Sequence, residues 1–405
     1  MKKFNYSAKN EKGELVSGEI DTVNQSSAAR ILIAKKLYPI EIKDIREGEL
    51  SFEKVPFFKG VSRKRKSVAI RQLATLINAG LPITQSLETM AKESGDTKLK
   101  DIFTDVLHEV EGGASLAQAS SKHTEVFSNL DISLVTAGEK SGTLDKVLKR
   151  MATQLEKETQ LISKVRGAMI YPAIILIVVV GVVLLMLIYV LPKLTVLYQD
   201  FKGQLPLATR VMIMISDFLK NFWWALILAF ISFAFGLKYF IKTDSGRRFW
   251  DLAKLKIPGV KILLMKIYLA RYTRTLGTLV GSGVSVLDSL KITADSVGNV
   301  IYKEDVLKAS NEIRAGGSLS HSLSSSKLFP SVVSQMIRVG EQTGEIDNML
   351  DSLANYYEEE VDTAIKSLST LIEPLIIVFM GLAVGGILIA IMTPIYNISQ
   401  VIFKK

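Results

Sequence analysis

Two glycine-flanked loops contain the first residues whose types could do chemistry. The stretch Gly138-Glu139-Lys140-Ser141-Gly142-Thr143 has the glycines, lysine and hydroxyl groups of a phosphate-binding loop. A Walker loop needs glycine directly before its lysine, and Glu139 stands in that place. The second loop, Gly340-Glu341-Gln342-Thr343-Gly344, has glutamine instead of the lysine. The sequence therefore argues against nucleotide binding, and the shared feature of the two loops is their glycine spacing.

The sequence also lacks the residue patterns that thiol, metal-dependent or serine-based catalysis would need. The chain has no cysteine, which excludes disulfides, thiolate nucleophiles and cysteine-ligated metals. Its three histidines, His108, His123 and His321, have no metal-binding spacing, and no serine stands in G-x-S-x-G. We therefore predict a protein that is not an enzyme and has no catalytic residue, no metal and no cofactor.

Three groups of carboxylates need an interpretation. Glu358-Glu359-Glu360 with Asp362, and Glu139 with Asp145, could bind a cation, although a solvated helix face and a carboxylate at a helix start are the favoured interpretations. Glu373 precedes Pro374 at the start of an apolar stretch, where a charged group is costly and suggests function. Alternatively, Glu373 lies at the amino end of a helix that has proline at its first position. Both interpretations of Glu373 stay open.

These residues lie beside three long apolar stretches. Residues 167–192 carry no formal charge, and a helix of that length spans roughly 39 Å, more than the hydrocarbon core of a bilayer. Residues 221–241 contain one lysine, Lys238, and begin near Trp223-Trp224. The third stretch, within residues 373–396, includes Gly381, Gly385 and Gly386, which let another helix approach closely. We predict three transmembrane helices at these ranges.

Basic residues near the spans predict their orientation, because Lys and Arg accumulate on the cytoplasmic side. They are dense before the first span and after the second, from Lys146 to Arg166 and from Lys242 to Lys266. We therefore expect cytoplasmic helical bundles at 67–166 and 242–372, an external loop with an amphipathic helix at 193–220 and an external tail at 397–405. This placement also accounts for the net charge of +10 without nucleic-acid binding. Met1-Lys2-Lys3 is followed by no apolar stretch, so we expect no cleavable signal peptide.

The chain contains an internal duplication. Arg71 to Gly80 match Arg274 to Gly283, and Pro172 matches Pro374, at offsets of 203 and 202 residues. Between these points Gly138, Glu139, Gly142 and Asp145 match Gly340, Glu341, Gly344 and Asp347. Apolar residues recur at helical spacing from Leu99 to Val110, and Gly80 and Gly283 suit left-handed turns between antiparallel helices. Each copy therefore reads as an antiparallel helix bundle that leads into a span.

The first residues have another character. Phe4, Tyr6 and Ala8 alternate as in a strand, Asn10 to Gly13 offer a turn, and Gly18-Glu19-Ile20 fit a returning strand. Asn24 or Ser26 could cap a helix that reaches Lys36, and Ile40-Glu41-Ile42 fit a third strand. We expect a small α/β module at 1–45 and a basic linker at 46–66. The fold class is a mainly α membrane protein with two duplicated bundles, three transmembrane helices and this module.

The paired motifs identify a family. R-x-L-x-T-L-x-x-x-G, a Gly-Gly-x-Ser-Leu segment, Gly-Glu-x-x-Gly-x-(Leu/Ile)-Asp and a proline at the span entry occur twice and resemble the type II secretion F domain over nearly the whole chain. The chain is similar to the polytopic inner-membrane platform proteins of type IV pilus and type II secretion machines. One departure is that Tyr171-Pro172 stands in the first copy where Glu373-Pro374 stands in the second.

The resemblance implies partners rather than chemistry. It implies a cytoplasmic assembly ATPase, pilin or pseudopilin subunits, other inner-membrane components, self-association into a homo-oligomer and membrane lipid, with a cytoplasmic N-terminus in the inner membrane. Candidate interaction or hinge residues are Gly80, Gly138, Glu139, Gly142, Asp145, Pro172, Gly283, Gly340, Glu341, Gly344, Asp347, Glu373 and Pro374. The alternative function is an oligomeric small-solute transporter or channel, which duplication and intramembrane Gly, Pro and Glu would suit. The type of machine and the oligomer number stay open.

Overall fold

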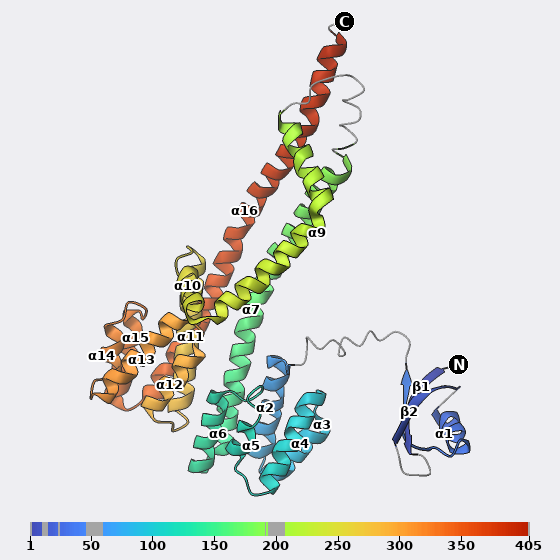
Figure 1. The fold of residues 1–405 in the computed structure, drawn as a ribbon. Helices are drawn as coiled ribbons and strands as arrows, with labels where there is room; N and C mark the ends of the chain where they lie inside the picture. The colour runs from blue at the N-terminus through green and yellow to red at the C-terminus, as the bar shows by residue number, and fades with distance from the viewer. Residues whose placement is uncertain are drawn as a thin grey trace. The chain divides into compact units, whose positions relative to one another are not determined.

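The computed structural model describes residues 2–9, 15–22, 25–45, 60–190, 192 and 207–403. The chain divides into two compact units, Met1–Gly60 and Val61–Lys405. Figure 1 labels the elements of both. The predicted turn at residues 10–13, Asn24, and most of the predicted linker and external loop lie outside the described residues.

The first unit is the predicted α/β module. Strands β1 (Lys2–Lys9), β2 (Leu15–Thr22) and β3 (Tyr38–Ile45) form an antiparallel sheet in the order β2-β1-β3, and helix α1 (Gln25–Ala34) connects β2 to β3. Tyr6 lies opposite Gly18, where a Cβ would come within 2.8 Å of the tyrosine oxygen, so glycine leaves room for the ring. Helix α1 ends before the predicted Lys36, which has a positive φ of 58°.

The second unit contains two helix bundles built to one plan. The first bundle consists of α2 (Arg63–Asn78), α3 (Ile83–Glu93), α4 (Thr97–Glu111), α5 (Leu116–Ser121), α6 (Asn129–Ser141) and α7 (Leu144–Leu185). In the same order, the second consists of α11 (Val260–Val280), α12 (Val286–Ser296), α13 (Val300–Arg314), α14 (Leu319–Ser324), α15 (Ser331–Thr343) and α16 (Ile346–Phe403). This confirms the predicted duplication of a helical module.

Glycine turns link corresponding helices in both bundles. Gly80 follows α2 with a φ of 88°, and Gly283 follows α11 with a φ of 84°. An L side chain disfavours this left-handed region, so glycine allows the chain to reverse there. The turn that the sequence predicts at both glycines is present. Gly113 and Gly316, after α4 and α13, have left-handed backbones as well.

Each bundle has its own apolar core. The first core includes Ile70, Phe103, Leu134 and Met151, and the second includes Tyr272, Tyr302 and Leu350. The two cores are joined, because Leu279 of α11 belongs to the first cluster and Leu161 of α7 packs against the second. The bundles are therefore packed against each other through shared apolar side chains.

Three helices are long and apolar enough to cross a membrane, as the sequence predicts: Leu144–Val190, Arg210–Lys242 and Ile346–Ile389. The first consists of α7 and a π-helical turn, η3 (Met186–Val190). The second lies in α9 (Leu207–Lys242), in which Phe222 has non-helical backbone angles. The kink at Phe222 lies next to the predicted start of the span at 221–241, and residues 207–220, part of the predicted external loop, belong to the same helix.

Two boundaries differ from the sequence-based predictions. The basic run Arg63-Lys64-Arg65-Lys66 is the first turn of α2, where Ser62 accepts a hydrogen bond from the Arg65 N–H, and not part of a linker. Helices α7 and α16 also continue without a break through Pro172 and Pro374. The interpretation of Glu373 as a residue at a helix amino end is therefore wrong, because α16 begins at Ile346. A long helix keeps its other hydrogen bonds on both sides of one proline, so the ring does not start a new helix.

Helix α10 (Asp244–Lys254), like α9 before it, has no counterpart in the duplication. Helix α10 begins after Thr243, whose hydroxyl accepts a hydrogen bond from the Gly246 N–H. Asp251 of α10 accepts a hydrogen bond from the Val300 N–H at the start of α13. Helix α10 therefore ties the end of the second span to the second bundle.

Candidate functional site: the duplicated hairpins and the contact between the bundles

The two glycine-flanked loops are tight hairpins at equivalent places. Gly142 ends α6 and Gly344 ends α15, with φ values of 68° and 76°. A Cβ at Gly138 would lie 3.1 Å from the Leu144 Cα, and one at Gly340 would lie 2.8 Å from the Ile346 Cα. The first glycine of each loop thus permits a close helix crossing, and the second permits the left-handed turn.

The glutamate of each loop holds a neighbouring short helix. The Leu116 N–H donates to Glu139 Oε1 at 2.5 Å and the Ala117 N–H donates to Oε2 at 3.1 Å. In the second copy, the Leu319 N–H donates to Glu341 Oε1 at 2.6 Å, and the Ser320 hydroxyl donates to Oε2 at 2.5 Å. Both carboxylates satisfy free N–H groups at a helix start. The sequence did not predict this contact, because Glu139 and Leu116 are 23 residues apart and no local pattern links them.

The aspartates of the two loops lie in the first turns of α7 and α16, near the positive ends of the helix dipoles. This agrees with the favoured sequence interpretation of Asp145. Asp347 also lies 3.7 Å from the Arg150 guanidinium of α7. Within the part of the chain that the structure describes, no group of three or more His, Cys, Asp or Glu side chains could hold a metal ion.

The arginine of the duplicated motif pairs with a glutamate in both bundles. Arg71 of α2 donates to both oxygens of Glu156 on α7, at 2.7 and 2.6 Å. Arg274 of α11 donates to Glu358 on α16 at 2.9 Å and also reaches Asp351 and Asn355. The two glutamates are equivalent under the 202-residue offset. The hydrogen bond from Arg71 is the main reason why the pKa of Glu156 lies below its ordinary value.

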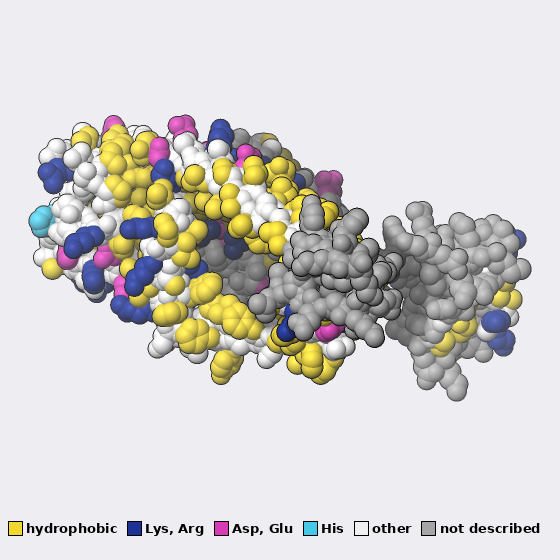
Figure 2. Space-filling model, turned by 90° about the horizontal axis from the view of Figure 1, so that it is seen from above, with side chains coloured by type: hydrophobic (Ala, Val, Ile, Leu, Met, Phe, Trp, Pro, Cys, Tyr) yellow, Lys and Arg dark blue, Asp and Glu magenta, His cyan; other side chains and the backbone are white. Residues whose placement is uncertain are grey.

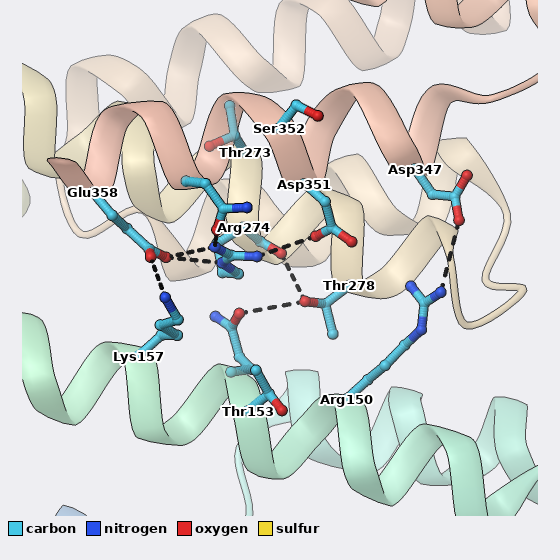
Figure 3. Close-up of polar contacts among 12 residues, drawn as sticks. Arg150, Thr153, Lys157, Thr273, Arg274, Thr278, Asp347, Asp351, Ser352 and Glu358 are labelled. Atoms are coloured by element: carbon cyan, nitrogen blue, oxygen red, sulfur yellow. Dashed lines mark hydrogen bonds and ion pairs between the residues drawn. The ribbon is translucent and has the colours of Figure 1, made fainter. Parts of the chain in front are cut away.

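The acidic run Glu358-Glu359-Glu360 and Asp362 is not simply a solvated helix face, as the sequence favoured. Lys157 of α7 donates to Glu358 at 2.9 Å, and Lys164 donates to Asp362 at 2.5 Å. Figure 3 shows Lys157 and Arg150 of α7 reaching toward Glu358 and Asp347 of α16. Two of these acids, Glu358 and Asp362, therefore pair with lysines of α7 in the other bundle, whereas Glu360 pairs with Lys266 of α11 in its own bundle.

A polar centre and a cavity lie within this contact. The Gln154 amide of α7 donates to the Thr275 hydroxyl at 3.3 Å, and the Thr278 hydroxyl donates to the Gln154 oxygen at 3.4 Å. Beside them lies a cavity of about 320 Å³ whose lining includes Leu130, Arg271 and Asp295. The contact between the bundles therefore combines ion pairs, a buried amide and unfilled volume, which is less tightly specified than either core.

Glu373 and the two prolines lie apart from the loops. Glu373 is exposed on α16, and none of the described residues forms a hydrogen bond or ion pair with it. Neighbouring exposed side chains include Leu371, Leu375 and Ile377. Figure 2 shows hydrophobic side chains gathered in large groups on the surface. The structure thus brings the loop residues of each copy together and leaves Glu373, Pro172 and Pro374 on apolar helix surfaces.

Comparison with known proteins decides the family. Residues 69–192 and 272–394 match the family described as type II secretion system (T2SS), protein F, and residues 1–43 match the N-terminal domain of that protein. The chain belongs to the type II secretion system protein F family. The two matched ranges are the two bundles with their following spans, which confirms the resemblance that the duplicated motifs indicated.

Relatives within the protein F family have two kinds of name. The chain is 37% identical to the type IV pilus assembly protein PilC of Thermus thermophilus, covering 98% of each sequence. It is 35% identical to the PilC protein of Myxococcus xanthus over 98% of this chain and 95% of that protein. It is 33% identical to the type II secretion system protein F of Pseudomonas aeruginosa over 99% of this chain and all of that protein.

The sequence predicted the residues of the duplicated loops but missed the glutamates that pair with the duplicated arginines. Glycines, glutamates and aspartates of the loops were predicted from the sequence because they recur at one offset. The partners Glu156 and Glu358 were missed, although their offset of 202 residues is the same signal. A search for repeated charges outside the conspicuous motifs would have found them.

Proposed function

We propose that this chain is the inner-membrane platform protein of a type IV pilus or type II secretion system, and that it couples a cytoplasmic assembly ATPase to the extraction and polymerisation of pilin or pseudopilin subunits. The duplicated bundles, each continuous with a membrane helix, are the observation that carries the proposal. Relatives named for pilus assembly and for secretion support it. The proposal involves no bond chemistry and no cofactor.

Continuity of α7 and α16 suits a mechanical role. Each helix contributes buried residues to a bundle, such as Met151 and Leu353, and then continues as a membrane helix. A helix transmits displacement along its axis because every turn is hydrogen-bonded to the next. A partner that shifts a bundle would therefore move the attached span. The loosely filled contact between the bundles would let one bundle shift relative to the other.

The orientation in this proposal places both bundles and the N-terminus in the cytoplasm. The basic residues near the spans support it. Several of them, including Lys157, Lys164 and Lys266, are paired with acids of α16. Others, including Lys146 and Lys149, are exposed on α7. These exposed cations are free to favour the cytoplasmic side.

The first test of the proposal uses the hairpin loops. Replacing both left-handed glycines, with Gly142→Val and Gly344→Val, should strain both hairpins, because a β-branched side chain is unfavourable at positive φ. We expect the double variant to insert in the membrane but to assemble no fibres and to retain less ATPase on purification. Gly167→Val is the control, because a Cβ at Gly167 meets nothing within 4 Å. Normal fibres from the double variant would count against a role of the hairpins in assembly.

The second test concerns Glu373, for which we propose a contact with a charge of a pilin subunit or other partner near the membrane. Its exposure on an apolar helix surface without a partner among the described residues motivates this proposal. Glu373→Gln and Glu373→Ala should slow assembly without lowering the amount of membrane-inserted protein. Assembly at the wild-type rate in both variants would remove Glu373 from the mechanism.

A further inference from the structure

Equivalent faces of the two bundles differ in exposure. Gln154 on α7 is 7% exposed because it faces α11, whereas its counterpart Tyr356 on α16 is 49% exposed. Leu130 on α6 is buried, and its counterpart Val332 on α15 is exposed. Val339 of α15 is exposed too. The face of α6 and α7 that is covered in the first bundle is thus open, and more apolar, on α15 and α16 of the second.

The face of α11 that packs against α7 differs from its equivalent on α2 in the opposite sense: it is buried in the second bundle and exposed in the first. Thr275 and Thr278 of α11 are buried against Gln154. Their counterparts on α2, Gln72 and Thr75, are exposed. Val68 of α2 is also exposed, at the place equivalent to Arg271. The face that α11 uses is therefore unoccupied on α2 among the described residues.

These differences show that the two bundles meet head to tail. A symmetric contact would place α6 and α7 against α15 and α16 through the same face of each. Instead, the face of α6 and α7 packs on α11 and α12. The equivalent face on α15 and α16, and the equivalent face on α2 and α3, therefore have no partner among the described residues. The α16 residues that reach α7, such as Glu358, lie on another side of that helix from Ser352, the counterpart of Arg150. Figure 3 shows Ser352 pointing away from α7.

We propose that a second copy of this chain occupies the open faces, with α15 and α16 of one chain packed on α2 and α3 of the next. This chain itself supplies the complement of each open face, and the contact within the chain is the template. A head-to-tail contact can repeat until it closes a ring. Helices α7 and α16 run side by side in the same direction (Figure 1), so the repeat keeps every span in one membrane.

Side chains at equivalent positions fit this assignment. Tyr356 takes the place of Gln154 and would meet Gln72 and Thr75. Lys140 and Asp288 line one cavity of about 460 Å³ between α6 and α12. Their counterparts are Gln342 and Gln85, so that a cation and an anion are both replaced by neutral amides. At these two positions the paired change leaves neither an unmatched cation nor an unmatched anion.

The contact between chains is weaker than the contact within a chain. Lys157 and Glu358, an ion pair within the chain, correspond to Glu359 and Glu156, which are both acidic. Lys164 and Asp362 correspond to Lys366 and Gln160. Arg71, which already holds Glu156, is the cation left to moderate the repulsion. We therefore expect Glu359 to be the residue that most weakens the contact between chains.

The chain has no cysteine, so introduced thiols test the contact cleanly. One full-length chain carries Gln72→Cys and a differently tagged one carries Tyr356→Cys, and both are reconstituted together in liposomes with a short bis-maleimide. We expect a mixed dimer in which Cys at 72 is joined to Cys at 356. Gln154→Cys with Thr275→Cys in one chain is the control and should cross-link within that chain. A Tyr356→Cys chain that joins only itself, or no mixed product, overturns the proposal.

A second variant strengthens the same contact. Glu359→Lys replaces the repelling pair with a lysine opposite Glu156, as Lys157 lies opposite Glu358 within the chain. We expect several-fold more mixed cross-link and a shift of the uncross-linked chain to larger species. Glu345→Lys, an exposed acid at the start of α16, is the matched control and should change neither. Unchanged or reduced cross-linking with Glu359→Lys contradicts the inference, which does not depend on the proposed function.

Discussion

The two bundles solve one structural problem in two ways. In the first, the Lys66 amine lies 2.5 Å from Asp131, a carboxylate that is 2% exposed and accepts hydrogen bonds from the Ser128 N–H and hydroxyl. In the second, the equivalent residues are Leu269 and Val333, both buried in the core. An ion pair between the buried Asp131 and the mostly buried Lys66 thus occupies the same place in one fold as a buried apolar pair. The duplication shows that these two positions need side chains that fit together, and that either a charged or an apolar pair meets that need.

The duplicated Arg–Glu pair differs from this case, because both bundles keep the same two residue types while the exposure of the pair changes. Side chains of Arg71 and Glu156 are 34% and 36% exposed, whereas those of Arg274 and Glu358 are 11% and 18% exposed. The second pair is covered by α7, which adds Lys157. The same ion pair is therefore a surface contact in one bundle and part of an interface in the other.

The largest expected effect comes from breaking the buried ion pair of the first bundle. Asp131→Val should destabilise the chain by about 3–5 kcal/mol, because Lys66 then stays buried and charged without a partner. Lys66→Leu together with Asp131→Val recreates the second bundle's solution and should restore stability to within about 1–2 kcal/mol of wild type. Urea unfolding of the full chain in detergent micelles measures both. A double variant as unstable as the single one would contradict the equivalence of the two positions.

The Arg–Glu pairs should differ in the same experiment. Arg274→Met leaves Glu358 and Asp351 without their shared donor and should cost about 2–3 kcal/mol. Arg71→Met is the matched variant and should cost less than about 1 kcal/mol, because a half-exposed pair is screened by solvent. Equal losses would show that the cover supplied by α7 does not strengthen the pair.

The close helix crossings should differ more modestly. Gly340→Ala places a Cβ 2.8 Å from the Ile346 Cα and should cost about 1–3 kcal/mol through overpacking. Gly138→Ala, with its nearest contact at 3.1 Å, should cost less. Gly381→Ala has open space and serves as the control. A larger loss at Gly138 than at Gly340 would reverse the expected order.

The smallest effects should appear away from neutral pH, with opposite signs in the two bundles. The pKa of Glu156 is lowered by its hydrogen bond from Arg71, so its stabilisation is present above the ordinary value of 4.5 and is lost as the pH falls below it. Burial raises the pKa of Tyr272 above its ordinary value of 10.0, so stability is lost as the pH rises above 10. Burial also raises the pKa of Tyr357 to about 12.

The melting temperature of the full chain measured against pH tests these signs. Glu156→Gln should reduce the fall in melting temperature at acid pH only. Tyr272→Phe should reduce the fall in melting temperature at alkaline pH only. Tyr272→Phe should cost little at pH 7, because the buried Tyr272 hydroxyl has no hydrogen-bond partner. An unchanged pH profile in either variant would remove that residue from the explanation.

Local sequence signals predicted much of the fold. Uncharged stretches gave three spans, alternation gave the β-strands, and the offset between Arg71 and Arg274 gave the duplicated bundles. Local signals failed where a contact joins distant parts of the chain. Glu139 was read beside Asp145, whereas its carboxylate binds the N–H groups of Leu116 and Ala117.

The start of the third span shows a second limit of the sequence. Proline often marks the first turn of a helix, so Pro374 suggested a helix end beside Glu373. The structure continues α16 from Ile346 to Phe403 because the apolar positions of the bundle, such as Leu353 and Val361, lead without a break into the span. Helix periodicity on both sides of a proline was the better guide.

The most direct test of the account asks whether the two bundles pack together on one face of the membrane. Gln154→Cys and Thr275→Cys place thiols at the 3.3 Å contact between α7 and α11 in a chain that has no other cysteine. In sealed inside-out vesicles, where the cytoplasmic face is outward, we predict that the pair cross-links within one chain and that a membrane-impermeant maleimide blocks it. No cross-link, with one thiol protected by the membrane and the other accessible, would contradict the account.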